Sequence, residues 1–188
     1  MPKSWSLTRR QLEQEFLCES LRGRVQYFLT HYHNIWHEDD GRFAVRVDGE
    51  EVFHAHPYNE WRYDVRSCEI KRERCIPERE WTNKGVYLHE DENRQAEEEG
   101  RILAIYDGYV DSFDIPRAIK KYMNQDIAAS LRSDDPLIRL FAILDRRVGK
   151  RTLKRLVQEV DQQPEWLKRF YYLRFESEGI AVANRKET

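Results

Sequence analysis

The spacing of apolar residues changes partway along this chain, and that change restricts the fold more than any other feature of the sequence. Between residues 24 and 56, apolar residues alternate with polar ones, as at Val25, Tyr27 and Leu29, which is the period of a strand with one buried face. From residue 58 onward they recur every three or four positions, which is the period of an amphipathic helix. The sequence therefore predicts an α+β protein in which a small sheet precedes a mostly helical part.

The alternating region divides into three strands. Asp48-Gly49 is a dipeptide typical of two-residue hairpin turns, and Asp39–Gly41 breaks the alternation before it. The predicted strands are Arg24–His33, Arg42–Asp48 and Glu50–His56. Before them, residues 6–22 have helical spacing and are followed by Gly23. We predict an N-terminal helix packed on a three-stranded antiparallel meander.

Prolines and glycines mark the ends of the later helices. The first spans Tyr58–Arg74, where we expect Cys68 and Cys75 to be small buried hydrophobes on one face. Residues 101–113 fit a hairpin at Asp107-Gly108 or a helix ending at Gly108, and apolar residues on both alternate faces favour the helix. Five more helices are predicted: from Ser112 or Asp114, through Ile127 and Leu131, from Asp135-Pro136, after Gly149, and from Pro164 to Gly179.

An acidic stretch lies between the two halves of the chain. Residues 78–99 hold eight acidic and three basic side chains, a net charge of −5, which predicts a linker or a solvated helix. We place a division beside it, with an α+β part at residues 1–90 and a helical part at residues 91–188. The two parts could also form one continuous domain.

Composition excludes several classes of protein. The 188 residues include 32 Lys and Arg and 34 Asp and Glu, so the formal charge of −2 excludes a globally basic nucleic-acid coat protein. Apolar runs such as residues 141–144 are far shorter than the roughly 20 residues that span a bilayer, so no membrane segment is expected. Met1–Trp5 lacks an apolar signal region, and three cysteines without a C-x-x-C pattern suit a reducing compartment. The expected location is the cytoplasm.

Two pairs of histidines form the first candidate site. His31 and His33 lie on the first predicted strand, and His54 and His56 lie on the third. Both strands end at the same edge of a meander, where imidazoles could bind a divalent metal ion with help from acidic loop residues. The alternative is two exposed pairs that share no ligand, which we favour because no complete metal motif is present.

Nucleophilic catalysis has little support in the sequence. A reactive cysteine needs a basic neighbour that stabilises its thiolate, and no such neighbour can be assigned to Cys68 or Cys75. None of the serines lies in a G-x-S-x-G turn. We therefore predict no catalytic residue and no cofactor.

A basic helical hairpin is the strongest candidate site. Residues 132–155 hold eight basic and three acidic side chains, a net charge of +5, on the faces opposite the apolar stripes of two helices that meet at Gly149. Seven of these bases are predicted to bind an anion or a partner: Arg139, Arg146, Arg147, Lys150, Arg151, Lys154 and Arg155. Lys150 and Arg151 lie at a helix start, where the dipole disfavours cations, which suggests an anion between them. The alternative is a solvated face that is balanced by the acidic stretch of the same molecule.

The residues around this hairpin also carry a family resemblance. The chain resembles a family of hypothetical bacterial proteins of about this length, above all at residues 135–139 and 144–153 and also at Ser4–Leu7, Ser20–Val25 and Val47–Gly49. The most specific part is Leu-Asp-Arg-Arg-Val-Gly-Lys-Arg, residues 144–151. The resemblance covers most of the chain and implies a bacterial, cytoplasmic protein. It implies no reaction, cofactor or catalytic residue.

These observations lead to one functional prediction and one alternative. The chain is predicted to be a non-catalytic interaction module whose basic hairpin binds an acidic protein surface or a nucleic acid. The partner is expected to be a protein, with nucleic acid as the other possibility. The alternative is a metal-dependent hydrolase or nuclease that uses the histidine edge of the sheet.

Overall fold

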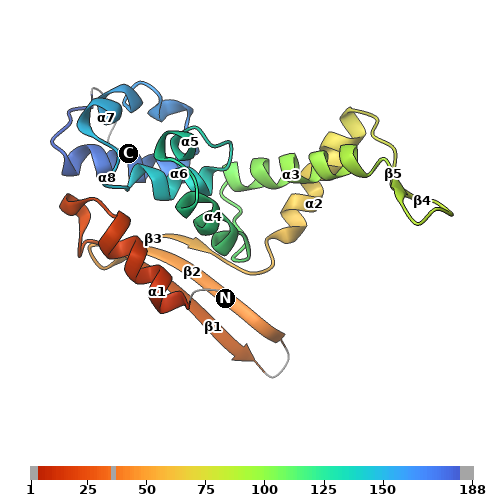
Figure 1. Ribbon diagram of the computed structural model, residues 1–188, viewed down its shortest axis with the longest axis horizontal. Helices are drawn as coiled ribbons and strands as arrows, with labels where there is room; N and C mark the ends of the chain where they lie inside the picture. Colours follow the sequence, from red (N-terminus) through yellow and green to blue (C-terminus); the bar gives the residue numbers. More distant parts are fainter. Residues whose placement is uncertain (1–3, 35–36, 183–188) are drawn as a thin grey trace.

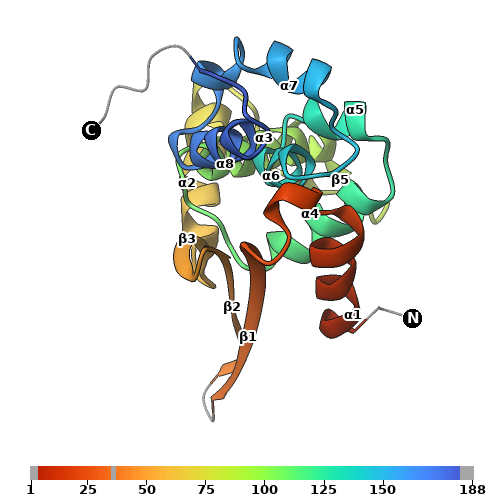
Figure 2. The ribbon, with the colours of Figure 1, turned by 90° about the vertical axis from the view of Figure 1, so that its left-hand side faces the viewer.

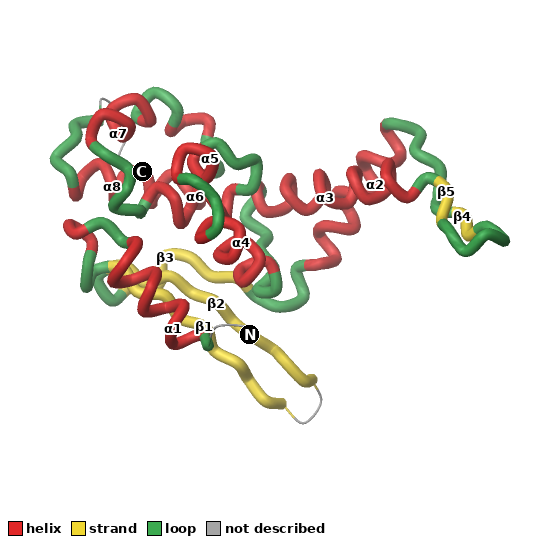
Figure 3. The backbone as a smooth tube through the Cα atoms, in the orientation of Figure 1, coloured by secondary structure: helices red, strands yellow, loops and turns green. Residues whose placement is uncertain are grey.

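The computed structural model describes residues 4–34 and 37–182, and for residues 31–40 it describes no side chains. A three-stranded sheet and the N-terminal helical segment form one side of a body, and short helices cover the inner face of that sheet (Figure 1). A pair of longer helices projects from the body (Figure 3). The predicted α+β class, with a sheet followed mostly by helices, is confirmed.

The sheet is the predicted antiparallel meander. Its strands are β1 (Val25–Asn34), β2 (His37–Val47) and β3 (Glu50–Ala55), in the order β1-β2-β3. Asp48 and Gly49 have φ angles of 52° and 89°, as expected for the two central residues of the predicted hairpin turn. The predicted break at Asp39–Gly41 is wrong, because β2 continues through these residues. The β1–β2 ribbon consequently extends past β3, away from the helices (Figure 2).

The N-terminal helix is shorter and less regular than predicted. Helix α1 (Trp5–Arg10) continues as one π-helical segment, η1 (Gln11–Phe16), and a 3-10 turn, η2 (Glu19–Leu21), precedes the sheet. The chain leaves helical geometry at Leu17, which forms an isolated antiparallel bridge with Asp145. The peptide groups of residues 16–18 bond the backbone of residues 144 and 146 instead of continuing the helix. Local spacing could not predict this interruption.

The core lies between the inner face of the sheet and the C-terminal helices. Those helices are α4 (Asp114–Met123), α5 (Ile127–Leu131), α6 (Pro136–Ile143), α7 (Lys150–Leu156), the 3-10 turn η3 (Val160–Gln162) and α8 (Glu165–Ser177). Phe43 of β2 and Phe141 of α6 are both buried, with ring centroids 6.4 Å apart. Residues from both predicted parts contribute to this core. The division at residue 90 stays a prediction.

Two antiparallel helices and a small hairpin form the projecting segment, which we call the arm. It comprises α2 (Glu60–Glu73), β4 (Glu80–Trp81), β5 (Tyr87–Leu88) and α3 (Glu90–Tyr106), and it extends to the right in Figure 1. The acidic stretch is therefore partly the predicted solvated helix, but residues 80–88 form a hairpin that the sequence did not indicate. Helix α3 runs through Gly100 and ends before Gly108, as favoured for residues 101–108.

Gly100 allows the two arm helices to pack closely. A Cβ atom at this position would lie 2.5 Å from the backbone nitrogen of Ser67 and 2.8 Å from its Cα atom. These atoms belong to the α2 backbone, so relief would require the two helices to separate. The glycine, which costs about 1 kcal/mol of helix propensity relative to alanine, is thus required by packing.

We expect Gly100→Ala to destabilise the protein despite the better helix propensity of alanine. Overpacking of this kind costs roughly 1–3 kcal/mol, and part of the effect should appear as splaying of the arm. Urea unfolding followed by circular dichroism measures the loss, and Gln95→Ala on the exposed side of α3 is the matched control. An unchanged or raised stability for Gly100→Ala would show that the helices do not approach as described.

Candidate functional site: the basic surface at helix α7

Helix α7 presents its cations to solvent because its apolar residues face the core. Leu153 and Leu156 are buried, whereas Lys150, Arg151 and Lys154 are exposed, as is Arg155. Gly149 precedes the helix in an extended conformation and makes no side-chain cap. The geometry of a short amphipathic helix therefore places four of the seven predicted site residues on one exposed side.

Arg147 is also exposed, but it differs from these four because its guanidinium is bonded within the fold. Its Nε and Nη2 atoms donate to Oδ2 of the buried Asp145 at 2.9 and 2.6 Å. The guanidinium also lies over the rings of Phe16 and Tyr122, with its Cζ atom 5.1 and 5.7 Å from the centroids. The hydrogen bonds from Arg147 to Asp145 raise the pKa of the guanidinium. An anion at the Gly149 turn would thus have Lys150 and Arg151 as ligands, without Arg147.

Arg139 likewise has an internal role. Its Nη1 atom donates to the carbonyl oxygen of Ser133 at 2.6 Å and to that of Asp134 at 3.3 Å. These bonds satisfy carbonyl groups in the loop between α5 and α6. The predicted site thus separates into two internal arginines and five others.

We call the remaining five the basic surface: Arg146, Lys150, Arg151, Lys154 and Arg155. Lys150 approaches Glu178 at 3.8 Å, and Arg155 approaches Glu159 at 3.9 Å, both near the limit of an ion pair. The other three have no ion pair among the described side chains, those of residues 4–30 and 41–182. Exposed pairs of this kind contribute only about 0–1 kcal/mol, so the cations stay available to a partner.

The acidic stretch does not balance the basic surface, because the arm neutralises it locally. Glu97 accepts from Lys71 at 2.8 Å and from Arg79 at 2.7 Å, and Glu99 accepts from Arg74 at 2.7 Å. The hydrogen bonds from Arg79 lower the pKa of Glu97 to about 2. The bond from Lys71 also lowers this pKa, and partial desolvation opposes the change. Figure 1 shows the arm and α7 on opposite sides of the molecule. No ion pair joins the acidic stretch to the basic surface among the described side chains, and a solvated basic face stays the alternative interpretation.

The histidine edge is only partly described. His54 and His56 have ring centroids 4.7 Å apart, and Nδ1 of His54 lies 3.3 Å from Glu51, which is itself bonded to Arg42. Burial and the neighbouring His54 lower the pKa of His56, so the imidazole of His56 favours the neutral form that a metal would need. The side chains of His31 and His33, and those of the loop to residue 40, lie outside the described residues.

Among the side chains that are described, no group of three His, Cys, Asp or Glu residues could hold a metal ion. A complete site would therefore need His31 or His33, and the metal-dependent alternative stays a prediction.

Cys68 of α2 and Cys75, which lies two residues past the end of that helix, are not buried as the sequence predicted. Cys68 and Cys75 are exposed, as is Trp61 on the same face, because α2 packs on α3 through Ser67 and Ile70 instead. The expectation of buried hydrophobes is wrong for both. The face that packs against α3 consists partly of small residues, and its pattern is weaker than that of the exposed face.

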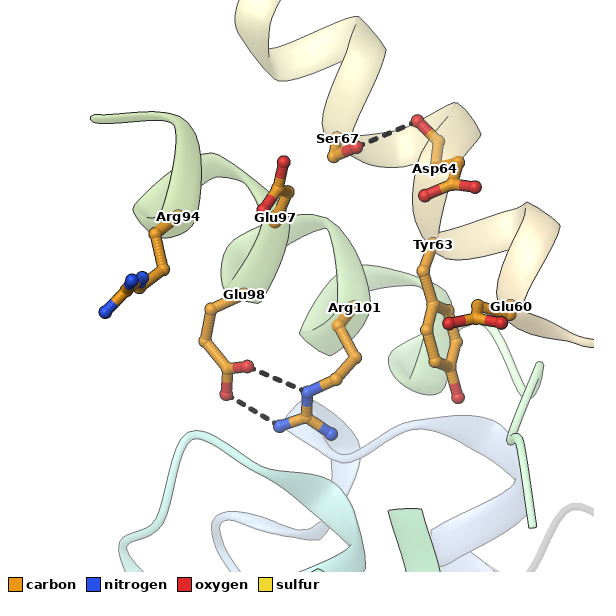
Figure 4. A pocket seen from close by; sticks show the side chains of 8 residues that line it. All are labelled: Glu60, Tyr63, Asp64, Ser67, Arg94, Glu97, Glu98 and Arg101. Atoms are coloured by element: carbon orange, nitrogen blue, oxygen red, sulfur yellow. Dashed lines mark hydrogen bonds and ion pairs between the residues drawn. The ribbon is translucent and has the colours of Figure 1, made fainter. Parts of the chain in front are cut away.

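A buried charge cluster at the base of the arm was not predicted at all. Arg101 of α3 donates to Asp114 of α4 at 3.1 Å and to Asp135, the residue before α6, at 2.8 Å. Figure 4 shows Glu98 bonded to the same guanidinium, beside a cavity of about 340 Å³. Burial raises the pKa of Asp114, which also accepts from the Tyr63 hydroxyl at 2.7 Å.

Each of these polar groups is thus bonded to at least one other member of the cluster. The cluster thereby joins the arm to the body. Asp114 and Asp135 were recognised only as possible helix caps. Arg101 had no sequence signal beyond its place in a helix.

No helix in the described part of the chain is long and apolar enough to cross a bilayer. The fold and the basic surface define an α+β protein with a projecting helical arm and a cationic surface formed by α7 and the turn before it. The chain belongs to the SF0329 protein family, whose model matches residues 4–175. Comparison with curated proteins and with solved structures gives no match for the chain.

Proposed function

We propose that this protein is a non-catalytic interaction module of the bacterial cytoplasm that binds an acidic protein surface through its basic surface. The observation that carries the proposal is the set of exposed cations on α7 and the preceding turn, of which Arg146, Arg151 and Lys154 have no ion pair within the described residues. Like-charged side chains held together without counter-charges are typical of surfaces that meet an anionic partner.

Two features favour an acidic protein over a nucleic acid. The chain as a whole carries a formal charge of −2, and the basic surface consists of only five side chains. Nucleic-acid affinity depends on many phosphate contacts, whereas electrostatic docking between proteins needs only a small complementary set. The partner that fits is a carboxylate-rich protein surface.

Reversing two charges tests the proposal. Lys150→Glu with Arg151→Glu should weaken binding of a glutamate-rich peptide at least tenfold, because two attractive contacts become repulsive. The thermal stability should stay level or rise slightly, because acidic residues at a helix start gain about 0.3–1 kcal/mol each from the dipole. Titration calorimetry at low salt and thermal unfolding measure the two effects.

The matched control is Lys120→Glu with Lys121→Glu, which changes the net charge equally at the exposed end of α4. This control should bind the peptide about as well as the unmodified protein. Equal binding by both double variants would contradict the proposal. Tighter binding of a duplex oligonucleotide than of the peptide, with a log–log salt slope near −0.9 per neutralised phosphate, would replace it with a nucleic-acid function.

A further inference from the structure

The exposed side of helix α2 has the pattern of a coiled-coil seam. Its residues follow spacings of four and three that alternate along the whole helix and just past its end, as in a heptad repeat: Trp61, Val65, Cys68, Arg72 and Cys75. The exposed fraction is 53% for Trp61 and 44% for Val65, and both cysteines are exposed. The stripe turns away from α3, and within the described structure the guanidinium of Arg62 lies over one of its members, Trp61.

We propose that this stripe is the interface of a homodimer in which α2 pairs antiparallel with α2 of a second copy. In the antiparallel register, Trp61 faces Arg72 of the second copy and Val65 faces its Cys68. Each layer then joins unlike positions of the seam, and the guanidinium of Arg72 lies against an aromatic ring. A parallel pair would instead place Arg72 against Arg72 in the seam.

Charges beside the seam favour the same direction. In the antiparallel pair, Arg62 comes beside Glu69 of the second copy, and Asp64 comes beside its Lys71. Both contacts join opposite charges on the two flanks of the interface. Within one copy, Lys71 also pairs with Glu97 and Glu69 with Arg66, so the flank contacts would be shared with these exposed ion pairs. A parallel pair would bring Asp64 beside Glu69, which are both acidic. The charge pattern therefore favours a second copy in the antiparallel orientation.

The surface also offers a hollow where the largest side chain of the stripe would dock. A hollow of about 690 Å³ lies beside the second half of α2. It is lined by Cys68, Arg72, Cys75 and Ile76, together with four polar or charged neighbours. Because Trp61 faces Arg72 in the antiparallel register, each indole would enter the hollow of the other copy. Trp and Arg are the residue types most enriched at the centre of interfaces.

Trp61 is also held in place before any partner arrives. The guanidinium of Arg62 lies over its ring with the Cζ atom 3.9 Å from the centroid, and lies over the ring of Tyr109 at 4.3 Å. This stack restricts the indole, so less rotamer freedom is lost on association. The two-fold axis would pass between residues 66 and 67, which gives a closed, symmetric dimer.

The first experiment measures the oligomeric state by sedimentation velocity over a range of concentrations. The unmodified protein should be a dimer at micromolar concentrations, and Trp61→Ala should raise the dimer dissociation constant at least tenfold. Trp81→Ala is the matched control, because Trp81 is an equally exposed tryptophan at the tip of the arm and outside the stripe. A monomeric unmodified protein, or equal dimerisation of the two variants, would overturn the proposal. Thermal unfolding confirms that both variants are folded.

The second experiment uses the native cysteines to test the orientation. With the axis between residues 66 and 67, the two copies of Cys68 lie about 5 Å apart along the helix direction, whereas the two copies of Cys75 lie about 25 Å apart. The buried Cys18 does not compete. Bismaleimidoethane should therefore cross-link Cys75→Ser, which retains Cys68, and should not cross-link Cys68→Ser. Dimers cross-linked equally in both variants, or in neither, would refute this interface even if the protein is dimeric.

Discussion

Replacing Arg101 with methionine should lower the free energy of unfolding by about 3–5 kcal/mol, because the buried Asp135 loses its cation and the buried Asp114 keeps only the longer contact with the exposed Arg117. The side chains of Arg101, Asp114 and Asp135 are each about one-tenth exposed, so water cannot replace the lost bonds. Methionine retains most of the apolar volume of the arginine stem, and the loss therefore reports on charge more than on packing. Urea unfolding at pH 7 measures it.

The pH dependence of this variant separates its cause from a general packing defect. Burial already raises the pKa of Asp114 above its unfolded value, and removal of Arg101 should raise it further. The native state then binds more protons than the unfolded state in the window from about pH 4 up to the raised pKa, so stability falls as the pH rises through that window. The deficit of Arg101→Met should accordingly be smaller at pH 4.5 than at pH 8.

The matched control for this prediction is Arg117→Met. Arg117 contacts the same Asp114 at 3.3 Å, but its side chain is 55% exposed, so the loss should stay below about 1 kcal/mol. Comparable losses for the two variants, or a deficit for Arg101→Met that does not change with pH, would contradict the role of Arg101 as a buried joint.

The second large effect is expected at Asp145, whose side chain is fully buried. It accepts from the guanidinium and the backbone nitrogen of Arg147 and from the hydroxyl of Tyr122. Asp145→Ala removes the anion and leaves these donors without an acceptor, which should cost about 3–5 kcal/mol. Thermal and urea unfolding measure the loss.

Asp134→Ala is the control for this substitution, because Asp134 lies eleven residues earlier and its side chain is exposed. That variant should retain stability within about 0.5 kcal/mol. If Asp145→Ala were as stable as this control, the bonds from Tyr122 and Arg147 to Asp145 would not hold α4 against the turn before α7.

The parts of the fold that could be predicted are those specified by neighbouring residues. Asp48-Gly49 defines a hairpin because of its backbone preferences, and Asp135-Pro136 begins a helix because of its capping chemistry. The arm was harder to predict because α3 packs on α2 partly through small residues such as Ala96 and Gly100. Small residues give a weak apolar pattern although they allow the closest packing.

Long-range contacts explain what could not be predicted of the site. The helical period correctly placed Lys150, Arg151 and their neighbours on an exposed face. It could not separate Arg147 from them, because the aromatic rings that hold Arg147 come from Phe16 and Tyr122, far away in the chain. The partners of Arg101 lie 13 and 34 residues further on, and no local pattern connects them.

Contacts between the first and last parts of the chain, such as the bridge between Leu17 and Asp145 and the packing of α6 on the sheet, have a consequence for how this protein is synthesised. The sheet is complete once β3 has emerged from the ribosome, but Phe141 and the rest of α6 that cover its inner face follow almost 90 residues later. At a synthesis rate of about 5–20 residues per second, the aromatic face of the nascent sheet stays uncovered for roughly 5–20 s. During that interval the growing chain offers a hydrophobic strand surface to chaperones and to other nascent chains, and the core closes only when nearly the whole polypeptide has been translated.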